Sequence, residues 1–176
     1  MIFTETTLAG AYLIEPERNI DERGFFANNW SAKEFVEHGL APQFVESNIS
    51  FSLKRGTLRG MHYQASPYGQ AKLVRCTSGA IFDVIIDLRP GSLSFRQWTA
   101  VELTAQNRLM LYVPVDFAHG FQTLEDNTEV TYQVSSPYHP ESSRGVRWDD
   151  QAFAITWPEA DRTIIARDRL YPDFVG

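Results

Sequence analysis

The segment Gly56-Thr57-Leu58-Arg59-Gly60-Met61-His62-Tyr63-Gln64 sets a histidine among glycines and apolar residues in a stretch that predicts β-structure. A second segment, Phe117-Ala118-His119-Gly120-Phe121, repeats this pattern downstream. Both imidazoles are therefore expected inside a β-structure rather than on its surface. A buried imidazole costs free energy unless it is hydrogen-bonded, and it exchanges a proton readily near neutral pH. The partners of these two histidines are thus the first candidates for functional residues.

The rest of the chain is rich in short apolar runs that end at turn residues such as Ser78-Gly79 and Glu125-Asp126-Asn127. Many short strands at this spacing favour an all-β fold, either a sandwich or a jelly roll that closes a two-sheet barrel. We expect an early strand within residues 2–15, suited to a sheet edge. Further strands are expected at residues 44–45, 48–51, 72–76, 80–88, 96–103, 109–113 and 130–134.

Helical signals are few. Ser31-Ala32-Lys33-Glu34 has the form of a capping box, with Gly39 as the stop, and it predicts a short helix. Residues 19–24 predict a turn. The chain shows no internal repeat, linker or low-complexity segment, so residues 1–176 are expected to form a single domain with one or two short helices. Residues 140–176 look irregular and are expected to wrap the barrel.

Composition limits the function. The formal net charge is −6, which argues against a general nucleic-acid or anionic-membrane role. The single cysteine, Cys76, excludes an intrachain disulfide and suits a reducing compartment. No signal-peptide pattern or membrane-length apolar run is present in the sequence. These features predict a soluble, cytoplasmic protein.

A metal site is not expected. Metal-binding cupins usually carry an H-x-H pair, whereas Tyr63 and Gln64 follow His62. The alternative for both histidines is a purely structural role, in which backbone groups form hydrogen bonds with the imidazole rings.

Other side chains are candidates to act in a reaction together with the two imidazoles. Tyr132 lies in an alternating strand and suits a general acid, although a core tyrosine has the same pattern. Lys72 begins a strand, where an ammonium would stabilise an enolate; its alternative is a surface lysine. Asp83 faces the same side of its strand as Asp87 and is a candidate to orient a histidine, as is Asp168. This set of groups suits removal of a proton α to a carbonyl, and that reaction requires no redox cofactor or metal.

The sequence resembles the dTDP-4-dehydrorhamnose 3,5-epimerase family over almost its whole length. The resemblance is carried by the residues at 21–26 (D-E-R-G-F-F), 58–64 (L-R-G-M-H-Y-Q), 70–75, 82–89, 114–121 and 147–158. It implies a cupin-type jelly roll, a homodimer that shares its N-terminal strand, and no metal or organic cofactor. It also implies an isomerase acting on a nucleotide-diphospho-sugar, in dTDP-rhamnose and cell-surface polysaccharide biosynthesis.

The resemblance assigns roles to particular residues. It makes His62 the base, with Asp168 raising its basicity, and Tyr132 the acid on the opposite face of the sugar. It places Lys72 and His119 around the sugar carbonyl and hydroxyls. The remaining substrate-binding assignments are the diphosphate clamp of Arg59 and of Arg23 from a second subunit, the base-stacking Tyr138, and the positions Asn28, Asn48, Ser143 and Arg167.

Asn19, Asn28, Glu46, Ser47, Ser143 and Arg167 depart from the residues usual in the family, while Asn48 and the positions of the chemistry are kept. The expected activity is epimerisation of a nucleotide-linked 4-keto-6-deoxyhexose at C3 and C5. The departures leave two variants open, a C3-only epimerase and an epimerase for a CDP- or GDP-linked sugar. A non-catalytic sugar-nucleotide-binding cupin is the alternative from another class.

Overall fold

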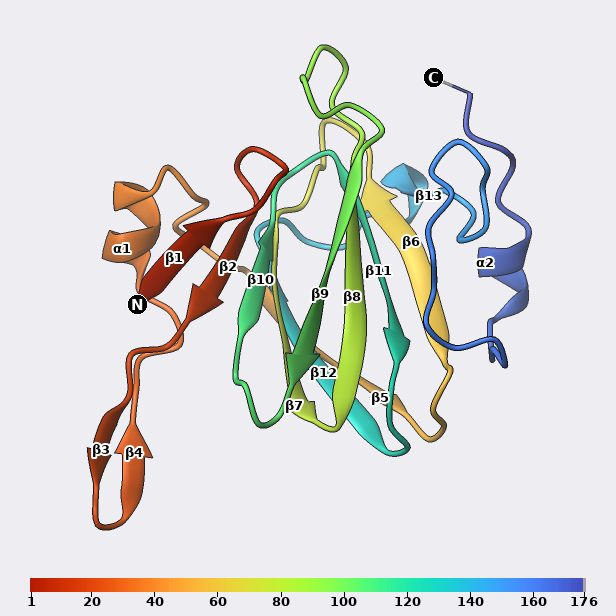
Figure 1. Ribbon diagram of the computed structural model, residues 1–176. Helices are drawn as coiled ribbons and strands as arrows, with labels where there is room; N and C mark the ends of the chain where they lie inside the picture. Colours follow the sequence, from red (N-terminus) through yellow and green to blue (C-terminus); the bar gives the residue numbers. More distant parts are fainter. Residues whose placement is uncertain (176) are drawn as a thin grey trace.

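Two antiparallel β-sheets packed face to face make up most of the computed structural model, which describes residues 1–175 (Figure 1). The six-stranded sheet contains, in spatial order, β1 (Ile2–Glu5), β2 (Tyr12–Glu15), β10 (Met110–Val113), β7 (Lys72–Ser78), β12 (Thr128–Val134) and β5 (Glu46–Ser52). The five-stranded sheet contains β13 (Ser143–Gly145), β6 (Leu58–Gln64), β11 (Phe117–Thr123), β8 (Ala80–Asp87) and β9 (Trp98–Thr104). The predicted all-β, cupin-type jelly roll is confirmed.

The apolar core lies between the sheets because alternate residues of each strand face inward. Val74, Leu111 and Val130 from the six-stranded sheet pack with Ile85 and Phe117 from the other sheet, and all five side chains are buried. The sheets therefore enclose an interior that is apolar over part of its length. The same inward rows continue into the functional site described below.

The C-terminal third covers the outer face of the five-stranded sheet, as the sequence predicted. Phe153, Trp157 and Ile164 pack there against Val84 and Ile86 of β8. This segment also contains the 3-10 helix η1 (Pro140–Ser142) and the short helix α2 (Ala166–Arg169). Figure 1 shows the blue C-terminal chain running beside β6 and β13. The wrapping brings residues near the C-terminus close to the strand that carries His62.

The capping-box helix is present as α1 (Ala32–Glu37). The Ser31 hydroxyl accepts a hydrogen bond from the Glu34 amide at 3.4 Å, and Gly39 follows with a φ of 70°. Phe35 is fully buried against the outer face of the six-stranded sheet, where Met110 belongs to the same cluster. Across residues 1–175, no helix has the length and apolar character needed to cross a membrane.

Several boundaries differ from the prediction. Residues 2–15 form a hairpin of two strands, with β1 at the sheet edge. Phe44 and Val45 precede β5 instead of belonging to a strand; Phe44 packs edge-on against Phe35. Arg96 has a φ of 66°, which interrupts the extended conformation, so β9 begins at Trp98. The predicted turn near residue 21 lies inside a separate hairpin of β3 (Asn19–Asp21) and β4 (Gly24–Phe26).

Candidate active site

A cavity of about 430 Å³ opens between the two sheets. Most of the predicted site residues line it, namely Arg59, His62, Lys72, His119, Tyr132, Tyr138, Ser143, Arg167 and Asp168. These residues are spread over more than a hundred positions of the chain. The fold therefore gathers at one place the side chains that the sequence singled out.

Strand alternation explains why these polar groups point inward. Lys72 precedes the core residue Val74 by two positions on β7, and Tyr132 follows the core residue Val130 by two positions on β12. His119 follows Phe117 in the same way on β11. The polar cavity is thus an extension of the apolar core along the same inward-facing rows.

Two glycines let the histidine strands approach closely. His62 and His119 are paired in register across β6 and β11, and the register shifts just beyond His119. Gly60 has a φ of 137°, and a Cβ added to it would lie 2.5 Å from the Cα of Gly120. Side chains at these two positions would push the strands apart. The glycines beside the histidines therefore place both imidazoles in one wall of the cavity.

His62 is paired with the buried carboxylate of Asp168 from α2. The His62 Nε2 atom lies 2.8 Å from Asp168 Oδ1, and the Gly60 amide donates to Asp168 Oδ2 at 3.1 Å. Burial alone would raise the pKa of Asp168, but the hydrogen bonds from His62, Gly60 and Arg167 lower it overall. An ionised carboxylate accepts the Nε2 proton, which leaves the lone pair of the imidazole on Nδ1.

The net effect on His62 differs from the expectation. Burial lowers the pKa of His62, and this effect exceeds the opposing influence of Asp168. The pairing with Asp168 does raise the pKa, as the resemblance implied, but burial, which that expectation left out, outweighs it. The consequence favours catalysis by a base, because a lowered pKa keeps the ring neutral at neutral pH.

A second histidine–carboxylate pair lies beside the first. His119 Nε2 is 2.7 Å from Asp83 Oδ1, and Asp83 is fully buried, so the prediction that Asp83 orients a histidine is confirmed. Asp87, by contrast, accepts hydrogen bonds from Arg89 and Ser94 at the other end of β8.

The alternative prediction, that Lys72 is a surface lysine, is wrong, because Lys72 is only 8% exposed. Its Nζ donates to the His62 carbonyl at 3.2 Å. Burial lowers its pKa to about 8, against the opposing charge of Asp83. The ammonium is therefore easily deprotonated for a lysine, while it still carries a charge near neutral pH.

Tyr132 approaches the cavity from the opposite sheet. It belongs to β12 of the six-stranded sheet, whereas His62 belongs to β6 of the five-stranded sheet. Burial raises the pKa of Tyr132, with a smaller opposing effect of Arg59, so the phenol carries its proton at neutral pH. A molecule bound between the sheets would have a neutral base on one side and a protonated acid on the other.

Three predicted residues do not line the cavity. Arg23 sits on the β3–β4 hairpin, is 83% exposed at its side chain and pairs with Asp21. Asn28 is exposed in the segment before α1. Asn48 is in register with Tyr132 and faces the same side of β5 as the cavity residue Ser50.

Sequence reasoning missed several lining residues, among them Ser50, Gln64, Gln70 and Thr163. Gln64 carried a signal, because it follows His62 by two positions on the same strand. Thr163 carried none, since its position depends on the path of the C-terminal segment. Within residues 1–175, no group of three or more His, Cys, Asp or Glu residues is arranged to hold a metal ion.

Fold and cavity together define an acid–base site inside a cupin-type jelly roll. A family model described as dTDP-4-dehydrorhamnose 3,5-epimerase matches residues 5–175. A relative of that name from Methanothermobacter thermautotrophicus is 46% identical over 89% of this chain and 83% of its own length. The chain belongs to the dTDP-4-dehydrorhamnose 3,5-epimerase family.

Solved structures agree with this assignment. The epimerase of this name from Elizabethkingia anophelis has a TM-score of 0.96 and 41% identity, covering 99% of this chain and 96% of that one. That from Bacillus anthracis, with TDP and pyrophosphate bound, has a TM-score of 0.94 and 40% identity, covering 98% of this chain and 99% of that one.

Proposed function

We propose that the protein is an isomerase that epimerises dTDP-4-dehydro-6-deoxyglucose at C3 and C5 to dTDP-4-dehydrorhamnose. The observation that carries the proposal is the placement of His62, paired with Asp168 of α2, on one sheet and of Tyr132 on the facing sheet. Epimerisation next to a ketone needs a base and an acid on opposite faces of the ring, and it needs neither a metal nor an organic cofactor.

The proposed reaction starts at a carbon next to the C4 ketone. The Nδ1 lone pair of His62 takes the proton from that carbon, and the electrons of the broken C–H bond move into an enolate. Lys72 and His119 stabilise the negative charge on the C4 oxygen. Tyr132 then donates its proton to the opposite face of the same carbon, which inverts its configuration. Proton transfer with solvent resets both groups before the second carbon reacts.

The nucleotide end is proposed to bind at the arginine-bearing part of the cavity. The Arg59 guanidinium is held by the Phe51 carbonyl at 3.0 Å and by the Ser52 hydroxyl at 3.3 Å, and it suits a diphosphate. The Bacillus anthracis relative is described with TDP and pyrophosphate bound, which supports a dTDP-linked substrate here. The C3-only reaction and the CDP- and GDP-linked sugars remain as outcomes of the test.

The test is proton NMR of the purified protein in deuterium oxide with dTDP-, CDP- and GDP-linked 4-keto-6-deoxyhexoses. Deuterium at C3 and C5 of the dTDP sugar is the expected result. Deuterium at C3 alone would make the protein a 3-epimerase. Binding of the sugar nucleotide without exchange would overturn the enzyme proposal in favour of a non-catalytic binding cupin.

The pH dependence of this exchange follows from two groups. His62 must be neutral, and burial lowers its pKa, so the rate should rise with pH and the midpoint of this rise should lie below the ordinary histidine value of about 6.5. Lys72 must be charged, so the rate should fall again as pH passes about 8. Lys72→Arg should retain the acid limb and move the alkaline limb to higher pH, because an arginine stays charged. A profile without an alkaline limb in the wild type would remove Lys72 from the mechanism.

We further propose a cytoplasmic homodimer built from single-domain chains. The β3–β4 hairpin projects away from both sheets (Figure 1). It exposes apolar residues, with Ile20 at 79% and Phe26 at 69% exposure, and it carries Arg23 away from its own cavity. Exposed apolar side chains of this kind suit a partner surface. A second copy of the chain would receive the hairpin and gain Arg23 near its diphosphate site.

This arrangement predicts complementation between inactive chains. Arg23→Ala and His62→Ala homodimers should both be impaired, the first in substrate affinity and the second in turnover. A mixed dimer should regain one good site, because that site takes His62 from one chain and Arg23 from the other. Activity measured after mixing and exchange of subunits checks this. No gain on mixing, in dimers shown by light scattering to exchange, would contradict the shared site.

A further inference from the structure

Gln64, the last residue of β6, holds the chain on both sides of Tyr138. Its Nε2 donates to the Pro137 carbonyl at 3.1 Å and to the Tyr68 carbonyl at 2.7 Å, and its Oε1 accepts from the His139 amide at 2.6 Å. Pro137 O and His139 N belong to the two peptide groups that flank Tyr138. One side chain thus fixes both peptide groups.

These hydrogen bonds are shielded from water, since Gln64 is only 4% exposed. Both hydrogens and the oxygen of its amide are in use, and a buried amide network of this kind is costly to disrupt. Tyr138, by contrast, is 56% exposed. Its own amide makes only a long bond of 3.4 Å to Glu46. The direction of the Tyr138 ring is therefore set by the backbone that Gln64 holds.

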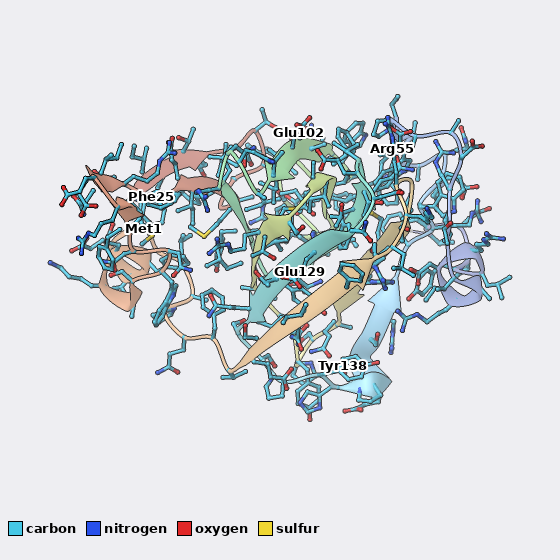
Figure 2. All side chains as sticks on the ribbon, turned by 90° about the horizontal axis from the view of Figure 1, so that it is seen from below. Met1, Phe25, Arg55, Glu102, Glu129 and Tyr138 are labelled. Atoms are coloured by element: carbon cyan, nitrogen blue, oxygen red, sulfur yellow. The ribbon has the colours of Figure 1, made fainter. Side chains whose placement is uncertain are left out.

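Gln64 also connects two loops at the mouth of the cavity. Tyr68 from the loop after β6 stacks on His139 with ring centroids 3.7 Å apart, and Gln70 donates to the Ser136 carbonyl at 2.6 Å. Figure 2 shows Tyr138 at the rim of the molecule beside β13, on a different side from Phe25 of the hairpin. The two loops together form a rim at the mouth of the cavity, and the hydrogen bonds of Gln64 attach this rim to β6.

The attachment lies two residues from His62, on the same side of the same strand, and both residues line the cavity. We propose that Gln64 is a positioning residue that sets the place of Tyr138 relative to the base His62. This inference rests on the proposed function and on the role that the family resemblance implies for Tyr138, the stacking of the nucleobase. Gln64 thereby holds the stacking platform for the nucleobase in the direction that binds the nucleotide.

The experiment compares wild type with Gln64→Met, which keeps the side-chain volume and removes all three hydrogen bonds. Calorimetry should show thymidine diphosphate binding about tenfold more weakly, because the stacking platform loses its fixed direction. Affinity for inorganic pyrophosphate, which has no base to stack, should not change. Turnover in deuterium exchange at saturating substrate should also stay the same, so that KM rises while kcat does not.

Four further variants make the test more specific. Tyr138→Ala combined with Gln64→Met should lose no more affinity than Tyr138→Ala alone, because both act through one ring. Gln64→Glu keeps the acceptor for His139 but not the donors, and it serves if the methionine variant fails to fold. Gln122→Met is the matched control: Gln122 is equally buried and holds both backbone groups of Glu159, away from Tyr138. It should lower thermal stability without changing nucleotide affinity.

Unchanged affinity for thymidine diphosphate in Gln64→Met, additive losses in the double variant, or an equal loss of pyrophosphate binding would each overturn the positioning role. A fall in kcat at constant affinity would do so too, since it would place Gln64 at the reacting carbons. If the wild type itself neither binds thymidine diphosphate nor exchanges any sugar proton, it is the proposed function that fails.

Discussion

His62→Ala is expected to abolish the exchange of C3 and C5 protons with deuterium oxide, a loss of at least about a thousandfold, since this removes the general base. The cavity offers no substitute for it. In the proposed reaction His119 is placed at the C4 oxygen and not over the reacting carbon, and Lys72 is a cation that would have to lose its proton first. Asp168 would keep the Gly60 amide and Arg167 as partners, so the fold should survive. NMR in deuterium oxide measures the effect directly.

A variant of the carboxylate partner and a control variant accompany this experiment. Asp168→Asn should also slow exchange strongly, because a neutral amide no longer fixes the tautomer that leaves the lone pair on Nδ1. His38→Ala is the control, since His38 lies after α1 and stacks on Phe3, away from the cavity. Exchange in His62→Ala near the wild-type rate, with His38→Ala also normal, would mean that another group is the base.

Sequence reasoning could find the parts of the site that depend on local periodicity. The inward position of Tyr132 follows from its alternation with Val130, and that of Lys72 from its alternation with Val74. The glycines and apolar residues next to His62 and His119 predict that both imidazoles lie inside the β-structure, where they are found. The helix α1 followed from its capping box, because a cap is a signal within four residues.

The parts that depend on long-range packing could not be found in this way. Asp168 meets His62 across 106 positions of the chain, and the residues alone gave no reason to prefer it over other carboxylates. The resemblance to a family supplied that pairing. It did not indicate the net direction of the His62 pKa, because the burial that lowers this pKa is a property of the folded cavity. Arg23 shows the converse, since a residue assigned to a site lies outside it within its own chain.

Tyr132→Phe is expected to separate the two halves of the reaction. The phenylalanine keeps the ring that packs beside Val130 and removes only the hydroxyl, which makes no hydrogen bond to any part of residues 1–175. Proton abstraction by His62 should continue, so deuterium should still enter the unreacted sugar. Net inversion should fall about a hundredfold or more, since the acid on the opposite face is gone.

Product formation and deuterium content of the remaining substrate, followed in the same NMR sample, measure both rates for Tyr132→Phe. Tyr112→Phe is the matched control, because it removes a hydroxyl that accepts from the Ala41 amide at 3.0 Å on the outer face of the same sheet. It should lower stability and leave both rates unchanged. If Tyr132→Phe reduced exchange and inversion equally, Tyr132 would bind or orient the sugar, and the proton for the opposite face would have to come from solvent. The ratio of the two rates, rather than either rate alone, therefore identifies the acid.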